Sequence, residues 1–229
     1  MAPSRAEAAS GGRFRDLTIR AVSAAVLAPL ALAAVWFGFP WYDLMVALAA
    51  VAMLSEWRRM AGGFTHPVWL ASGSFYLVAA VVAALWLRHD ARMGQLTILW
   101  VLAVVWATDI FAFFAGRAIG GPKLAPRISP GKTWSGLAGG MAAAAAASAV
   151  FSVWSAAPLS SLCFWGAATA VVAQAGDLLE SAAKRRFGVK DSGTLIPGHG
   201  GILDRVDGLV AALLLVAIAR LLGGGSVPW

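Results

Sequence analysis

The sequence predicts an all-α fold, a polytopic transmembrane helical bundle of about seven spans. Of the 229 residues, 60% are hydrophobic and 13% are charged, whereas a soluble domain is about 45–50% apolar and about 25% charged. Several apolar runs approach or exceed the roughly 20 residues that a spanning helix needs. Because backbone polar groups in lipid must be paired within the protein, these runs are expected to be helices.

The expected spans are, in chain order, 19–39, 41–57, 69–87, 95–115, 134–156, 158–180 and 203–222. Residues 1–18 are small, polar and mixed in charge, which predicts a disordered cytoplasmic tail. Residues 19–229 are expected to form a single integral membrane catalytic domain. The first span has a basic lead-in like a secretory signal, but its apolar run continues to Phe39, so a retained anchor is expected.

Basic residues predict the orientation of the spans. Fifteen of the 18 Lys and Arg residues fall on the side of the N-terminus, and only Arg88, Arg92 and Arg220 fall on the other side. The positive-inside rule therefore places the N-terminus in the cytoplasm. Basic loops beside anionic lipid headgroups also explain the net charge of +7, so no nucleic-acid partner is expected.

Two predicted cytoplasmic loops, residues 116–133 and 184–205, are rich in Gly, Pro, Lys and Arg. Such loops let backbone and cations approach an anion closely. Gly131-Lys132-Thr133 resembles the end of a P-loop, but that motif needs a Gly where Pro126 stands, and no strand is expected before it. Ser129, Lys132 and Thr133 remain candidate contacts to an anionic substrate.

Acidic residues within or at the ends of spans are the most informative feature. Asp109 lies in the fourth span, Asp177 in the sixth and Asp204 at the entry to the seventh. An Asp at the centre of a membrane helix costs about 2.5–3.5 kcal/mol, so such residues indicate function. Helical spacing places two sets on shared faces. These sets are Gln174, Asp177, Ser181 and Lys184 in span six, and Asp204 and Asp207 in span seven.

These carboxylates predict a metal site. If spans six and seven pack together, Asp177 approaches Asp204, and a divalent cation would offset their repulsion. Oxygen ligands suit Mg²⁺, Mn²⁺ or Ca²⁺. Zinc is disfavoured because only His199 and the distant Cys163 offer softer donors.

Two alternatives to a metal site stay open at this point. One is a set of structural ion pairs, with Lys184 on Asp177 and with Arg205 or Lys190 on Asp204. The other is a proton or ion path built on Asp109 and Asp177.

The stretch from Ser181 to Asp207, SAAKRRFGVKDSGTLIPGHGGILDRVD, resembles the signature of the phosphatidate cytidylyltransferases, also called CDP-diacylglycerol synthases. That signature reads Ser, two residues, Lys-Arg, four residues, Lys-Asp, a Pro/Gly-rich turn, His-Gly-Gly and Asp-Arg-x-Asp. Gly176-Asp177-Leu178 and residues 128–133 also resemble the family, and the likeness extends loosely over residues 56–222. Ala183 departs from it, since the family usually has a larger apolar residue there.

The resemblance implies a reaction in phospholipid synthesis, in which CTP and phosphatidate give CDP-diacylglycerol and pyrophosphate. It implies Mg²⁺, with Mn²⁺ and a second cation left open, and a membrane protein that is often a homodimer. A bacterial inner membrane with the active site on the cytoplasmic side is expected. Carried onto this chain, the family's metal ligands fall on Asp177 and Asp204.

The same reaction suggests roles for the remaining polar residues. Lys184, Lys190 and Arg205 are candidates for contacts to the α-phosphate and the leaving group. Asp207 is expected to orient Arg205 or to hold a metal-bound water, and His199 either contacts phosphate or shapes the Gly-rich turn. The candidate substrate-binding residues are Ser129, Lys132, Thr133, Ser181 and Asp109.

Three other functions remain as alternatives. A CTP-dependent lipid or polyprenol kinase would transfer the γ-phosphoryl group and release CDP. A cytidylyltransferase could also act on an ether-linked isoprenoid phosphatide. An ion-coupled transporter, from a different class of protein, would use Asp109 and Asp177 as its ion path.

Overall fold

The computed structural model describes residues 22–23, 25–155, 157–196 and 200–223. The predicted tail, the start of the first expected span and His199 lie outside these ranges. An apolar helix covers Ala25–Phe37. It is followed by α2 (Trp41–Met60), the 3₁₀ turn η1 (Gly63–Thr65), α3 (Pro67–Arg88), α4 (Gly94–Ile119), β1 (Lys123–Ala125), β2 (Ser129–Thr133), α5 (Trp134–Phe151), α6 (Leu159–Arg186) and α7 (Leu203–Leu222).

The predicted helical character and the approximate helix positions are confirmed, because a helix occupies most of the described part of each expected span. Within the described residues, α3, α4, α5 and α6 are long and apolar enough to cross a membrane. The helices α2 and α7 each carry two acidic and two basic residues, which lowers their hydropathy. The total of seven spans and the cytoplasmic N-terminus stay predictions.

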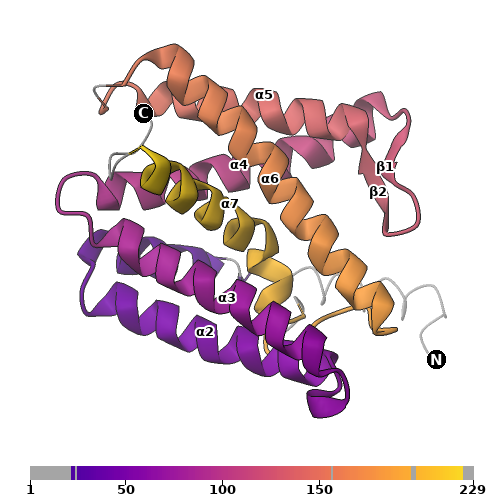
Figure 1. Cartoon of the computed structure of the whole chain (residues 1–229). Helices are drawn as coiled ribbons and strands as arrows, with labels where there is room; N and C mark the ends of the chain where they lie inside the picture. Colours follow the sequence, from indigo (N-terminus) through magenta and orange to yellow (C-terminus); the bar gives the residue numbers. More distant parts are fainter. Residues whose placement is uncertain (1–21, 24, 156, 197–199, 224–229) are drawn as a thin grey trace, which may run out of the picture.

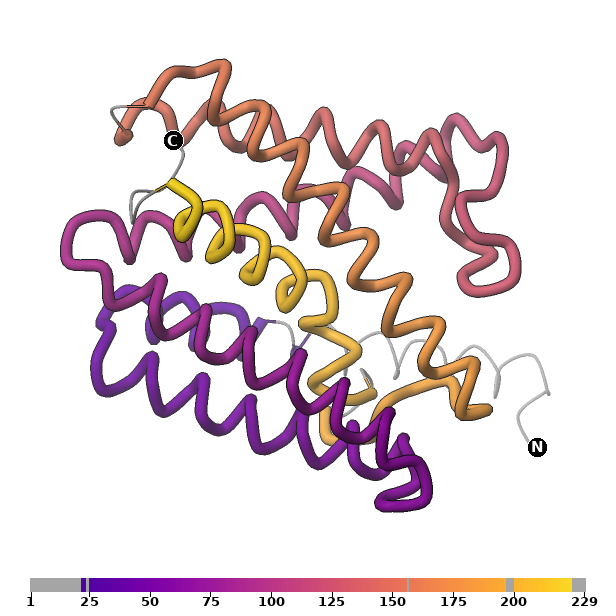
Figure 2. The backbone as a smooth tube through the Cα atoms, viewed as in Figure 1, coloured from indigo at the N-terminus to yellow at the C-terminus, as the bar shows by residue number. Residues whose placement is uncertain are grey.

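The helix α7 lies in the middle of the bundle, between the α2–α3 pair and the group formed by α4, α5 and α6 (Figures 1 and 2). Its contacts with α6 and α3 join the two groups. The core around it includes fully buried Trp100, Val104, Leu162 and Val216. The first turn of α7, which carries Asp204 and Asp207, is thereby brought against the C-terminal half of α6.

Glycines let α4 and α5 pack closely, as expected for small residues spaced four apart. A Cβ atom on Gly136 would lie 2.8 Å from the Ala112 carbonyl oxygen, and one on Gly140 would lie 3.1 Å from the Thr108 carbonyl oxygen. The close approach holds the start of α5, and the strand that leads into it, beside α4.

The predicted loop at residues 116–133 contains two short strands, β1 and β2, which form an antiparallel hairpin with Lys123 opposite Thr133. The expectation that no strand precedes α5 was wrong, because β2 contains Gly131-Lys132-Thr133 and leads directly into that helix. Pro126 still excludes a P-loop. Cross-strand contacts decide such short pairing, and a five-residue strand carries too little periodicity to reveal it.

The helix α6 extends to Arg186, six residues beyond its expected end at 180. Lys184, Arg185 and Arg186 occupy its last turn, where cations interact favourably with the negative end of the helix dipole. The second polar loop is therefore shorter than expected and covers residues 187–202. By contrast, α5 ends at Phe151, short of the expected 156.

Candidate active site

Five polar side chains from three elements meet where the hairpin touches α6. The Lys132 ammonium on β2 lies 2.7 Å from Asp177 Oδ2 and donates to Gln174 Oε1 at 2.9 Å. The Gln174 amide nitrogen donates in turn to Asp109 Oδ1 on α4, at 3.1 Å. Ser181 Oγ donates to Asp177 Oδ1 at 3.3 Å. The hairpin thus carries a cation to a row of oxygen atoms on α4 and α6.

Asp207 on α7 adds a third carboxylate to this group. It interacts electrostatically with Asp177 and with Asp109, and its Oδ1 accepts from the Gly208 N–H at 2.8 Å. Close packing of α6 on α7 permits the approach, since a Cβ atom on Gly176 would lie 2.8 Å from the Asp207 carbonyl oxygen. The Lys132 ammonium, which pairs with Asp177 and interacts electrostatically with Asp109, therefore lies in a group with three carboxylates.

A second cluster lies one to two turns further along α6. Lys184 Nζ is 2.7 Å from Glu180 Oε2 and 2.8 Å from Asp204 Oδ1. Asp204 also accepts from the Ser192 N–H at 3.0 Å and from the Gly201 N–H at 2.8 Å. Asp204 therefore ties the loop between α6 and α7 to the start of α7.

Asp177, Ser181 and Gln174 share one face of α6 as predicted, but the Asp177–Lys184 pair of the structural alternative is replaced by other pairs. Asp177 pairs with Lys132 rather than with Lys184, and Asp204 pairs with Lys184. Seven residues along a helix correspond to about 10 Å of rise, which is too far for a direct pair between Asp177 and Lys184. Glu180, four residues before Lys184, lies close enough on the same face.

The loop after α6 needs glycine at one position of this cluster. Gly200 has a φ of +85°, and a Cβ atom there would lie 2.8 Å from Asp204 Oδ2. The Ile196 N–H donates to the Gly200 carbonyl oxygen at 2.9 Å, which closes the turn. Part of the predicted Gly-rich signature thus serves to bring backbone close to a carboxylate.

Other predicted site residues lie nearby with different roles. The Thr133 hydroxyl caps α5 by accepting from the Gly136 N–H at 3.0 Å, and the Thr133 side chain is buried. Ser129 is half-buried in β2, whereas Lys190 and Arg205 are exposed. His199 lies outside the described residues. The structure therefore brings together Asp109, Lys132, Asp177, Ser181 and Asp207, and separately Lys184 and Asp204.

The oxygen atoms at this site fit the Mg²⁺ that the resemblance implies. Carboxylate and amide oxygens around Asp177 are the hard donors that Mg²⁺ prefers. The negative charge of the carboxylates of Asp109, Asp177 and Asp207 exceeds the single positive charge of Lys132. The oxygens of Asp204 are already engaged by Lys184, Ser192 and Gly201. Within the described ranges no three His, Cys, Asp or Glu side chains form a preassembled cage. The residues fit a cation held by few carboxylates and by substrate phosphates.

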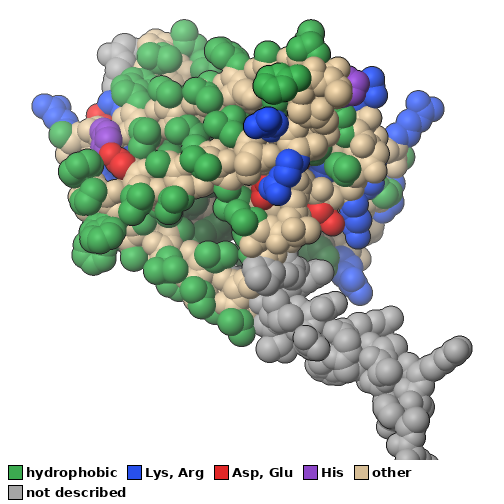
Figure 3. Space-filling model, turned by 90° about the horizontal axis from the view of Figure 1, so that it is seen from below, with side chains coloured by type: hydrophobic (Ala, Val, Ile, Leu, Met, Phe, Trp, Pro, Cys, Tyr) green, Lys and Arg blue, Asp and Glu red, His purple; other side chains and the backbone are tan. Residues whose placement is uncertain are grey.

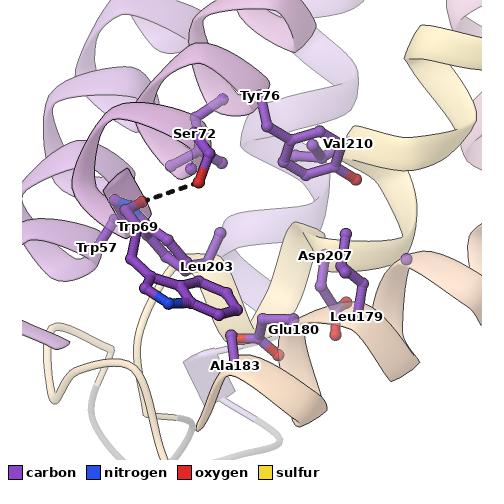
Figure 4. Close-up of a pocket in the computed structure, with 13 residues that line it drawn as sticks. Trp57, Trp69, Ser72, Tyr76, Leu179, Glu180, Ala183, Leu203, Asp207 and Val210 are labelled. Carbon is purple, nitrogen blue, oxygen red and sulfur yellow. Dashed lines mark hydrogen bonds between the residues drawn. The ribbon is translucent and has the colours of Figure 1, made fainter. Parts of the chain in front are cut away.

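An apolar cavity of about 250 Å³ lies beside the carboxylates, between α2, α3, α6 and α7. Trp57, Trp69 and Tyr76 line one side, and Glu180 and Asp207 lie opposite (Figure 4). Glu180 is 7% exposed, and neither of its carboxylate oxygens accepts a well-aligned hydrogen bond. The Lys184 ammonium 2.7 Å away nevertheless compensates its charge. The cavity therefore joins an apolar wall to a charged end.

Sequence reasoning missed two acids that the structure places at this site. Glu180 follows Asp177 by three residues and lies on the same face of α6. That spacing could have identified Glu180 as a site residue. Glu56 is fully buried and bonds to the loop after α6. An acid within an expected membrane span was the available signal.

Basic side chains surround this end of the molecule. On the face seen in Figure 3, Lys and Arg gather at the edge where the hairpin and the end of α6 lie in Figure 1, and hydrophobic side chains cover the opposite part. Acidic side chains lie between the cations and the hydrophobic surface. A negatively charged ligand would meet this edge first.

Comparison with known proteins gives a consistent result. A family model described as "Cytidylyltransferase family" matches residues 63–222. A phosphatidate cytidylyltransferase from Brucella abortus is 49% identical over 177 residues, which cover 75% of this chain and 62% of that protein. The matched segment thus spans less than two thirds of that relative.

Two further relatives carry the same name. One from Rickettsia bellii is 35% identical over 205 residues, which cover 85% of this chain and 87% of the relative. One from Haemophilus influenzae is 45% identical over 131 residues, covering 55% and 46%. The matched family region includes Asp109, Lys132, Asp177, Asp204 and Asp207.

Proposed function

The chain belongs to the cytidylyltransferase family, and we propose that it transfers the cytidylyl group of CTP to phosphatidate. The products are CDP-diacylglycerol, a precursor in phospholipid synthesis, and pyrophosphate. The observation that carries the proposal is the placement of Lys132 and three carboxylates within a region matched by relatives named phosphatidate cytidylyltransferase. Oxygen-rich and cationic groups side by side suit the joining of two phosphate-containing substrates.

The reaction forms one bond and breaks one bond. A phosphate oxygen of phosphatidate attacks the α-phosphorus of CTP, and the bond from that phosphorus to the bridging oxygen of the β-phosphate breaks. Pyrophosphate leaves with the bonding electrons. The phosphatidate phosphate is already largely ionised, so the site needs alignment and charge neutralisation more than a strong base.

Three basic residues are proposed to contact the anionic substrates. Lys132 reaches the site from β2, and its ammonium would turn from Asp177 to a nucleotide phosphate. Lys190 and Arg205 are exposed, and their cationic side chains suit the departing pyrophosphate. Lys184 lies between two carboxylates, so its proposed part is to hold Asp204 and Glu180.

Asp177 is the proposed main ligand of Mg²⁺, and its Lys132 and Ser181 contacts position the carboxylate. Asp204 stays the predicted second ligand, and ligation there would replace one of its contacts to Lys184, Ser192 or Gly201. Asp109 and Asp207 interact electrostatically with Asp177 and are further oxygen donors. When bound, Mg²⁺ supplies charge neutralisation to the phosphates of CTP.

The apolar cavity suggests where the lipid lies. Its aromatic wall of Trp57, Trp69 and Tyr76 would contact the hydrocarbon part of phosphatidate, with the phosphate directed toward Asp207 and the bound cation.

We further propose that the site faces the cytoplasm of a bacterial cell, at its inner membrane. The homodimer implied by the resemblance is checked by light scattering of the detergent-solubilised chain.

Position-specific labels in CTP test the reaction. Purified protein is mixed with phosphatidate, Mg²⁺ and CTP labelled either at the α- or at the γ-phosphate. We expect the α-label in the lipid and the γ-label in pyrophosphate, with no transfer when divalent cations are chelated.

The same labels separate the alternatives. A γ-label in the lipid, with release of CDP, would identify a kinase. Faster transfer to an ether-linked isoprenoid phosphatide than to phosphatidate would change the proposed lipid. Absence of turnover with every lipid phosphate would reject the enzyme proposal and favour an ion-coupled transporter.

A further inference from the structure

Glu56 on α2 connects to the loop after α6 across more than 130 residues of sequence. Its side chain is 0% exposed. One carboxylate oxygen accepts from the Ile202 N–H at 3.0 Å. The other accepts from the Leu203 N–H at 2.9 Å and from Ser192 Oγ at 3.2 Å. All three donors belong to the loop or to the first residue of α7.

The carboxylate supplies the cap that α7 lacks. Ile202 stands at the N-cap position and has no side-chain cap, so the first amides of α7 need an outside acceptor. Glu56 satisfies two of these amides, and the positive end of the helix dipole favours its negative charge. A charge at a fully buried position is thereby stabilised by backbone donors.

Two glycines leave the space that Glu56 occupies. A Cβ atom on Gly193 would lie 2.7 Å from Glu56 Oε1, and its two next nearest atoms also belong to Glu56. A Cβ atom on Gly201 would lie 2.6 Å from Glu56 Oε2 and 2.2 Å from Ser192 Oγ. The loop is therefore shaped around this carboxylate.

Glu56 and Asp204 hold the same segment from two sides. The Ser192 backbone N–H bonds to Asp204, whereas the Ser192 hydroxyl bonds to Glu56. Likewise, the Gly201 N–H bonds to Asp204, and the next two amides bond to Glu56. The position of Asp204 thus depends on a residue of α2 that itself lies outside the group of substrate contacts.

We propose that Glu56 is a positioning residue for cytidylyl transfer. It fixes the segment 192–203 so that Asp204 and the first turn of α7 face the nucleotide and its cation. Its effect passes through the loop, and it contacts no reacting atom. The inference rests on the proposed function, so its test includes a readout that needs no turnover.

The kinetic arm compares Glu56→Gln with Asp43→Asn, which neutralises an acid on the same helix about 20 Å away. Glutamine places an NH₂ group against a backbone N–H, so one acceptor is lost. We expect Glu56→Gln to lower kcat/KM for CTP about tenfold or more, as for a lost hydrogen bond to a charged group. The Mg²⁺ concentration for half-maximal activity should rise, and KM for phosphatidate should stay within about twofold.

The second arm measures hydrogen–deuterium exchange in detergent micelles. In Glu56→Gln the peptide covering residues 200–206 should exchange faster, because one of the two amides, of Ile202 or Leu203, loses its acceptor. Peptides from the hairpin and from α4 should be unchanged. Asp43→Asn should leave both regions as in the wild type.

A mutant cycle with Gly193→Ala shows whether Glu56 itself shapes the loop. Gly193→Ala alone should increase exchange at 200–206, because its Cβ atom meets the carboxylate. In a Glu56→Ala background that contact is absent, so Gly193→Ala should add nothing further. Additive increases would overturn the assignment.

Two other outcomes would also reject the inference. One is unchanged exchange in Glu56→Gln, which would mean that the carboxylate does not hold the loop. The other is a fall in kcat with the KM for CTP and the Mg²⁺ concentration for half-maximal activity both unchanged, which a general loss of folded enzyme would give. If the wild type transfers no cytidylyl group, the proposed function fails, whereas the exchange arm still decides whether Glu56 fixes the loop.

Discussion

The two ends of the bundle treat charge differently. At the end near the hairpin, Lys132 and Lys184 pair with three members of a group of five carboxylates. These are Asp109, Asp177, Glu180, Asp204 and Asp207. At the opposite end, each acid has its own partner: Asp43 bonds to the His89 ring at 3.0 Å, and Asp90 pairs with Arg220.

The opposite end has the features of a structural closure. Arg220 also stacks over Trp86, with its guanidinium carbon 4.6 Å from the ring centroid, and Arg88 donates twice to the Val35 carbonyl oxygen. These contacts fasten the ends of neighbouring helices. The site is distinguished by carboxylates that outnumber the ammonium groups paired with them. Such carboxylates need a cation or substrate partner.

The largest effect that distinguishes the two ends is expected for Asp177→Asn. Loss of the proposed metal ligand should lower kcat for cytidylyl transfer by about 10²–10³, as for removal of one stabilising electrostatic group. The matched control, Asp90→Asn at the opposite end, should retain wild-type kcat. Similar kcat losses in both variants would contradict the assignment of the site to one end.

A stability measurement compares Lys184→Met with Arg220→Met. Lys184→Met leaves Glu180 and Asp204 without their cation, and a broken buried pair costs about 3–5 kcal/mol. Arg220→Met leaves the more exposed Asp90, so a cost of about 1 kcal/mol is expected. The melting temperature in one detergent should fall more for Lys184→Met than for Arg220→Met. The reverse order would contradict the assignment of a buried, shared cation to Lys184.

The hairpin offers a matched pair of lysines. Lys132→Met should raise KM for CTP about tenfold, as expected when a charged hydrogen bond to substrate is lost. Lys123→Met, an exposed position on the neighbouring strand β1, should change KM by less than about twofold. Equal effects would indicate that the hairpin acts only through its overall charge.

The smallest expected effect is the pH dependence of the Asp90–Arg220 pair. The Met93 N–H and the Arg220 guanidinium lower the pKa of Asp90 below its ordinary 3.8. Its stabilising contribution is therefore complete above that ordinary value and is lost as the pH falls through the lower folded-state pKa. The difference in melting temperature between wild type and Asp90→Asn should shrink as the pH is lowered from about 6 to about 3. A difference that grows would contradict a stabilising role for ionised Asp90.

Much of the fold could be predicted because lipid leaves few options for an apolar run. The expected spans agree with the helices in the described part of the chain, and the α6 face with Asp177 and Lys184 was correct. The pairing partners were not predictable in the same way. Lys132 comes from a hairpin 45 residues before Asp177, and sequence spacing within one helix cannot show such a neighbour.

Glu56 illustrates the same limit. Its burial and its bonds to Ile202 and Leu203 arise only when α2 lies beside the start of α7. Nothing local in α2 distinguishes an acid near a helix end from one that caps another helix. The signature stretch identified the loop, whereas the residue that holds this loop lies far outside that stretch.

The sequence by itself determined the helices, the polar loops, the acidic faces and the resemblance that names a reaction. These follow from composition and from periodicity along one segment, which local physics governs. Only the tertiary structure decided which charges meet, because Coulomb and hydrogen-bond interactions act over a few ångströms in space. It placed Lys132 on Asp177, Lys184 between Glu180 and Asp204, and Glu56 at the first amides of α7.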